Sequence, residues 1–135
     1  MNMFHLTTRY PFSLSDRVEG IRRGFDIIDD MINSENHVGI VSVSMNVLED
    51  LVRFRDPDSI YDLKMKKDFW KTLNDLTLSG VFSEEMESRI LGMWKGRRLM
   101  SHLFHYNFDD LTSPRFSSSC VDLVDEVSHV VLGEY

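Results

Sequence analysis

The stretch LSDRVEGIRRGFDIIDDMIN, residues Leu14–Asn33, is the clearest helical pattern in the chain and decides its fold class. Charged residues fill most positions between its apolar ones, and Ser13 can cap its first turn. The apolar residues recur at intervals of three and four, which places them on one face of an α-helix: Val18, Ile21, Phe25, Ile28 and Ile32. The pattern predicts a long amphipathic helix that buries one face.

Four further segments are predicted to be helical, from their apolar spacing and from residues that begin or end helices. They are Ser42–Phe54; residues 56–78, begun by Asp56 and Pro57 and ended before Gly80; Glu84–Tyr106, capped by Ser83; and Cys120–Leu132, with Ser119 and Asp122 as a capping box and Gly133 as the stop. The run TSPRFSSS, residues Thr112–Ser119, is typical of a loop.

The beginning of the second helix is ambiguous. Residues His37–Met45 alternate in a way that fits a strand, and their apolar residues fit a helix equally well. We favour a helix from Ser42, entered through an extended piece at Val38–Val41. We therefore expect an all-α fold, a compact bundle of about five helices in a single domain over residues 1–135. A small α+β fold, with a minor hairpin between residues 1–10 and 38–43, is the alternative.

The composition is that of an ordinary globular domain. The chain has 135 residues, 42% hydrophobic and 27% charged, and its net charge is −7. This charge disfavours general nucleic-acid binding, so nucleic acid would need a local basic patch. No run reaches the ~20 apolar residues of a membrane-spanning helix, so we expect no membrane partner. The N-terminus lacks the pattern of a secretory signal.

The single cysteine, Cys120, cannot form an internal disulfide, which indicates a reducing compartment. We therefore expect an intracellular protein. It would be cytoplasmic, or in the cytoplasm or nucleus of a host cell if the chain is viral.

The segment Glu84–Tyr106 concentrates the unusual chemistry of the chain. Gly92 and Gly96 lie four residues apart inside it, and each costs about 1 kcal/mol of helix stability relative to alanine. Such a pair permits the close approach of another helix, from the same chain or from a partner, and we expect a homodimer. A kink between two shorter helices is the alternative interpretation.

A possible catalytic group lies on the same segment. On an ideal helix, Arg98, His102 and His105 share one flank beside the buried stripe. Histidine can transfer protons near neutral pH, and arginine can hold a phosphate with two hydrogen bonds. A solvated flank without a function is the simpler alternative.

The spacings Arg97-x4-His102 and Arg98-x6-His105 resemble the Arg-x4–6-His motif of the HEPN family of helical ribonucleases. That family is all-α, of similar length, and cuts RNA without a metal, usually across a dimer interface. The resemblance implies that Arg98 with His105, or Arg97 with His102, would be catalytic.

No metal or cofactor is expected. His102-x-x-His105 and Glu126-x-x-His129 come nearest to a metal pattern, but a di-iron carboxylate site needs two Glu-x-x-His copies and two further glutamates. The sequence also lacks a glycine-rich phosphate loop and a nucleophile elbow.

These observations predict a small interaction or regulatory protein, an adaptor, inhibitor or accessory factor that binds another protein through helix surfaces without catalysis. A chain this short also suits a viral or phage accessory protein. The candidate partner-binding residues combine two glycines, a tryptophan and the basic side chains of two helices: Gly92, Trp94, Lys95, Gly96, Arg97, Arg98, Lys64, Lys67 and Lys71. A metal-independent ribonuclease of the HEPN type is the alternative function.

Overall fold

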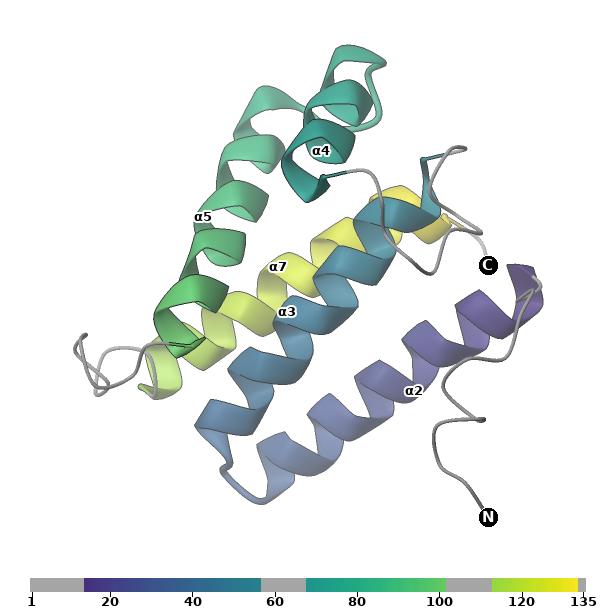
Figure 1. Ribbon diagram of the computed structural model, residues 1–135. Coiled ribbons are helices and arrows are strands. Elements are labelled where there is room, and N and C mark those ends of the chain that lie inside the picture. Colours follow the sequence, from purple (N-terminus) through teal and green to yellow (C-terminus); the bar gives the residue numbers. More distant parts are fainter. Residues whose placement is uncertain (1–13, 57–67, 102–112, 134–135) are drawn as a thin grey trace.

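The computed structural model describes residues 14–56, 68–101 and 113–133, and it places the side chains of these residues except Leu14 and residues 96–101 (Figure 1). Within these ranges the chain forms five helices and no strand, which confirms the all-α bundle. The helices are α2 (Leu14–Asn33), α3 (His37–Phe54), α4 (Phe69–Leu78), α5 (Glu84–Ser101) and α7 (Pro114–Leu132).

Helix α3 is the centre of the bundle. It runs antiparallel to α2, and α7 lies along its other side (Figure 1). Ten residues of α3 are buried, among them Leu48 and Leu51 with no exposed surface. Helix α7 contributes a fully buried valine stripe of Val124, Val127 and Val131. These apolar surfaces form one continuous core, because each helix places its apolar face toward α3.

Helix α2 has the bounds that its sequence predicts, and Val18, Ile21 and Ile28 of the predicted stripe are buried. Ile32 is 44% exposed, since it lies in the last turn of α2 where the chain leaves for α3. The crossing of α2 and α3 is close at Gly24. A Cβ atom added there would lie 2.5 Å from Val47 Cγ2, so this crossing needs a glycine.

The predicted start of the second helix was wrong. Helix α3 begins at His37, and Val38–Val41 is helical rather than extended. The Asn36 side chain accepts a hydrogen bond from the Gly39 amide at 3.0 Å and so starts the helix five residues earlier than Ser42. Burial of the valines outweighs their preference for strands. The hairpin alternative is therefore wrong for residues 38–43, and residues 1–10 lie outside the described residues.

The predicted helix over residues 56–78 was too long. Asp68 is extended, with φ −59° and ψ 138°, and its side chain accepts from the Trp70 amide at 3.3 Å, so α4 begins at Phe69. A carboxylate that caps one helix end interrupts any helix that would run through it. Residues 57–67 lie outside the described residues. The predicted end was correct, because α4 ends at Leu78 and Gly80 has φ +86°.

Helix α5 begins at Glu84 as predicted, because Ser83 Oγ accepts a hydrogen bond from the Met86 amide at 3.1 Å. It runs through Gly92 and Gly96 without interruption to Ser101. The structure therefore excludes two shorter helices joined at these glycines. The predicted residues 102–106 lie outside the described residues.

The predicted start of the last helix was also wrong. Helix α7 begins at Pro114, because Ser113 Oγ accepts from the Phe116 amide at 3.1 Å and proline suits the first helical position. Ser119 lies inside the helix and donates to the Arg115 carbonyl at 3.0 Å, so it is not part of a capping box. The loop predicted at Thr112–Ser119 is therefore helical from Pro114 on. The predicted stop was correct, since Gly133 has φ +56°.

Candidate partner-binding surface on α4 and α5

Helix α5 is attached to the bundle by a narrow buried face. Ile90 has no exposed surface and Met93 is 6% exposed, and both belong to the core. The helix contacts α4, α3 and α7 (Figure 1). Each side of α5 borders an open cavity. Of the predicted partner-binding residues, Gly92, Trp94 and Lys95 line these two cavities, whereas Lys71 lines neither.

The first cavity lies between α4 and α5 and has a volume of about 420 Å³. It is lined by Asp68, Trp70, Leu91, Trp94 and Lys95, and we call these residues the tryptophan face. Leu91, Trp94 and Lys95 are spaced by three and one along α5, so they share one side of that helix.

Packing inside this face leaves part of the aromatic surface uncovered. The Trp94 ring stacks on the buried Phe69 ring, with centroids 5.1 Å apart and planes 17° apart. Trp70 also lines the cavity and is 46% exposed. Leu78 follows it by eight residues, about two turns further along the same side of α4, and is 80% exposed. These two have the largest exposed fractions among the large apolar residues that the structure describes.

Polar groups on this face also lack partners. The indole N–H of Trp94 is shielded from solvent, and no acceptor lies within hydrogen-bond distance of it. Lys95 and the neighbouring Lys71 are exposed and form no ion pair with any residue in the described ranges. Asp68 differs, because its carboxylate caps α4. The tryptophan face therefore contains a shielded hydrogen-bond donor without a partner, and the positive charge of Lys95.

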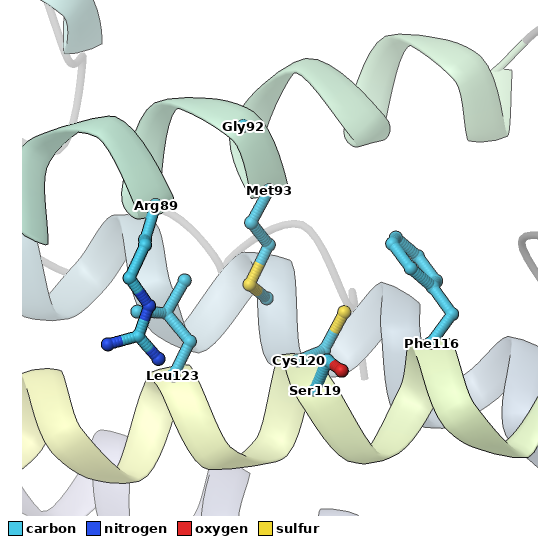
Figure 2. Close-up of a pocket in the computed structure, with 7 residues that line it drawn as sticks. All are labelled: Arg89, Gly92, Met93, Phe116, Ser119, Cys120 and Leu123. Carbon is cyan, nitrogen blue, oxygen red and sulfur yellow. The ribbon is translucent and has the colours of Figure 1, made fainter. Parts of the chain in front are cut away.

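The second cavity is a groove of about 350 Å³ between α5 and α7. Figure 2 shows Arg89 and Met93 extending from α5 toward α7, and Phe116 and Cys120 extending from α7 toward α5. Gly92 is exposed on the wall of this groove, and a Cβ atom added to it would meet nothing within 4 Å. No described residue therefore approaches Gly92 closely, and its predicted close contact inside the chain is absent from the described structure.

An ion pair links the two helices at this groove. The Arg89 guanidinium donates a hydrogen bond to the Glu126 carboxylate, and both side chains are about half exposed. The hydrogen bond raises the pKa of Arg89 and lowers the pKa of Glu126. Cys120 lies deeper, and burial raises the pKa of its thiol to about 11. This thiol is therefore protonated and unreactive at neutral pH.

Several predicted residues fall where the structure says nothing of their side chains. Gly96, Arg97 and Arg98 belong to α5, but their surroundings are not described. His102, His105, Lys64 and Lys67 lie outside the described residues. The ribonuclease grouping and the wider basic patch therefore stay predictions.

The metal pattern near the C-terminus has a different use. His129 is largely exposed, and its Nδ1 lies 2.8 Å from the Asp125 carbonyl oxygen and 3.9 Å from the Asp125 carboxylate, while Glu126 binds Arg89. Across residues 14–56, 68–101 and 113–133, no three His, Cys, Asp or Glu side chains gather as a metal site would require.

Three residues of the surface were missed as candidates, namely Trp70, Leu78 and Arg89. Helix α4 buries Phe69, Thr72, Leu73 and Leu76. With that stripe recognised, Trp70 and Leu78 both fall on the opposite side, which was the available signal. Arg89 could not have been found, because its partner Glu126 is 37 residues away.

The chain matches no protein-family model, no curated protein and no solved structure. Among the described helices, none combines the length and the apolar character needed to span a bilayer.

Proposed function

We propose that this chain is a small intracellular interaction protein, an adaptor, inhibitor or accessory factor that binds another protein through α4 and α5 without catalysis. The observation that carries this proposal is the tryptophan face, in which Trp70 is half exposed and the indole N–H of Trp94 has no acceptor. Tryptophan is enriched among the residues that dominate binding energy at protein interfaces.

The exposed apolar surface of α4 supports the same function. Trp70 and Leu78 lie on one side of a ten-residue helix, and Lys71 is exposed beside them. Apolar anchors with charged residues at their border are typical of a protein-binding surface. A partner that covered them would bury this apolar area and accept hydrogen bonds from the free donors.

The open groove at Gly92 supports a homodimer as part of this proposal. A glycine in the interior of a helix weakens it by about 1 kcal/mol relative to alanine, and no described contact of α5 requires one here. A helix of a second copy could approach at this position. Sedimentation equilibrium over a range of concentrations tests this, because Gly92→Trp should shift the protein to monomer while Gly20→Trp, on the exposed side of α2, should not.

A pull-down from cells of the source organism tests the interaction function. We expect the wild-type chain to retain a partner protein that Trp70→Ala loses. Ile27→Ala is the matched control, because Ile27 on α2 is 45% exposed against 46% for Trp70. Circular dichroism should show that both variants are folded. Equal retention by wild type and both variants would mean that the tryptophan face is not the binding surface.

The ribonuclease alternative has its own test, since the described residues leave it open. It predicts that the purified protein cleaves RNA in the presence of EDTA and that His105→Ala abolishes the cleavage. Intact RNA after incubation with wild-type protein at high concentration would end this alternative.

A further inference from the structure

Building on the proposed function, we infer that the tryptophan face binds an acidic segment of another protein. An apolar side chain of that segment occupies the cavity lined by Trp70 and Trp94, and its carboxylates lie at Lys95, which also lines the cavity, and at Lys71, the residue that follows Trp70. The inference that the partner segment is acidic can be wrong while the proposed interaction function is correct.

The charge distribution is the first argument. The chain has 22 acidic and 15 basic residues, so an acidic ligand is repelled by most of its surface. Lys71 and Lys95 stand on two neighbouring helices, exposed and without a carboxylate partner among the described residues. The carboxylate of Asp68, which lines this cavity, already accepts a hydrogen bond from the Trp70 amide. The two lysines can therefore attract the carboxylates of an acidic segment that binds at this face.

The unpaired indole is the second argument. A buried N–H without an acceptor costs on the order of 1–3 kcal/mol. The Trp94 indole N–H is in this state, and Trp94 is one of the residues that line the cavity. A ligand carbonyl or carboxylate could accept this hydrogen bond if the indole turned slightly toward the cavity. Indole and ammonium groups can only donate, so the matching ligand is rich in acceptors.

A nucleic acid is also anionic and can stack on tryptophan, but the face suits a protein segment better. One side of the Trp94 ring is already covered by Phe69, which removes a stacking surface. Two lysines on a chain of net charge −7 also neutralise few phosphates. The cavity is bordered by Leu91 as well, so its walls favour an apolar side chain.

The two tryptophans of the chain both lie on this face, so tryptophan fluorescence reports on it alone. The experiment selects peptides from a random library against the full-length protein and then titrates the recovered peptides, all without tryptophan. We expect sequences with aspartate or glutamate on both sides of an apolar residue. Their binding should change the tryptophan emission to saturation and weaken as salt is added.

Charge-reversal variants make the test specific. Lys71→Glu with Lys95→Glu should weaken these peptides by about tenfold, in line with two exposed ion pairs. Arg23→Glu with Arg115→Glu is the matched control, because it changes the net charge equally at exposed cations of α2 and α7. Peptides with asparagine and glutamine in place of the acids should lose affinity for the wild-type protein.

Four results would overturn the inference. They are recovery of no peptide, recovery of peptides without carboxylates, equal weakening by both double variants, and an emission change with oligouridylate that the acidic peptides do not produce. Self-association that depends on Lys71 and Lys95 would assign the face to a second copy and would likewise overturn it. The pull-down with Trp70→Ala decides the proposed function separately, because that variant keeps both lysines.

Discussion

The α2–α3 crossing and the α5–α7 groove use a helical glycine in opposite ways. At Gly24 the two helices are so close that an added Cβ would lie 2.5 Å from Val47 Cγ2. At Gly92 the same atom would meet nothing within 4 Å, although this residue of α5 is among those that line the groove beside α7 (Figure 2). The fold explains the first glycine and leaves the second unexplained. The difference separates a closed packing region, α2–α3–α7, from an open one, α4–α5.

The two regions also differ in how much they bury. Helix α3 buries ten residues between α2 and α7, whereas α5 holds to the core mainly through Ile90 and Met93. Because a core helix is stabilised mainly by the apolar area that it buries, the closed region should determine the stability of the protein. The open region is then free to change its surface without unfolding the chain.

The largest expected difference between the regions is in stability. Leu51→Ala in α3 removes a side chain with no exposed surface and should lower the free energy of unfolding by about 2–5 kcal/mol. Leu78→Ala in α4 removes one that is 80% exposed and should change it by less than about 0.5 kcal/mol. Urea denaturation followed by circular dichroism measures both. A comparable loss in the two variants would erase the distinction between the regions.

The Cys120 thiol gives the next largest effect. Burial raises its pKa from 9.0 to about 11, so the native thiol should react with an alkylating reagent roughly 100-fold more slowly at pH 8 than in the unfolded chain. Because folding favours the protonated thiol, this contribution to stability is full below pH 9 and is lost as the pH rises toward 11.

Alkylation followed by mass spectrometry, with and without urea, measures this reactivity. Equal rates in the two conditions would mean that the groove in Figure 2 does not bury the thiol. Peptide bound at the tryptophan face should leave the rate unchanged, since Cys120 lines the other cavity.

The two glycines should respond to alanine with opposite signs. Gly92→Ala adds helix propensity without a clash and should stabilise the protein by up to about 1 kcal/mol. Gly24→Ala forces Val47 and the helix crossing to adjust, which should destabilise the protein by about 1–3 kcal/mol. The gain in helix propensity offsets only part of this loss. Thermal unfolding of the monomer compares them, with Gly20→Ala as a second open position. A destabilised Gly92→Ala monomer would show that the α5–α7 groove is closed.

The glycines also show what the sequence could predict and what it could not. The pair Gly92 and Gly96 stood out because four-residue spacing permits close packing, yet the close approaches in the described structure occur at Gly24 and Gly39. A glycine in the sequence shows that a side chain is absent, but it does not show which residue packs into the space. At Gly24 that residue is Val47, which is 23 residues further along the chain. Contacts of this kind require the tertiary arrangement.

The helix boundaries likewise could be predicted only where the signal lies in the local sequence. The bounds of α2 were predicted fully, because its apolar stripe is continuous. The start of α7 was missed, because the serines in its first turns resemble a loop. The helix begins at Pro114, capped by Ser113, and Ser117 in its first turns is buried. In the candidate surface, Trp94, Lys95 and Lys71 were predicted and are exposed or half-buried, while Trp70 needed the buried side of α4 to be known.

The smallest expected effect concerns the ion pair between α5 and α7. Arg89→Ala and Glu126→Ala, alone and together, form a double-mutant cycle whose coupling should be favourable, weak and reduced by salt, since both side chains are about half exposed. Because Arg89 lowers the pKa of Glu126, this coupling is present above the ordinary glutamate pKa and disappears as the pH falls through the lowered value. The pair Glu19 and Arg22 within α2 is the control, because it is similarly exposed but joins no second helix. A strong coupling that salt does not reduce would mean that α5 is held firmly to α7, and the open region would then be part of the rigid core.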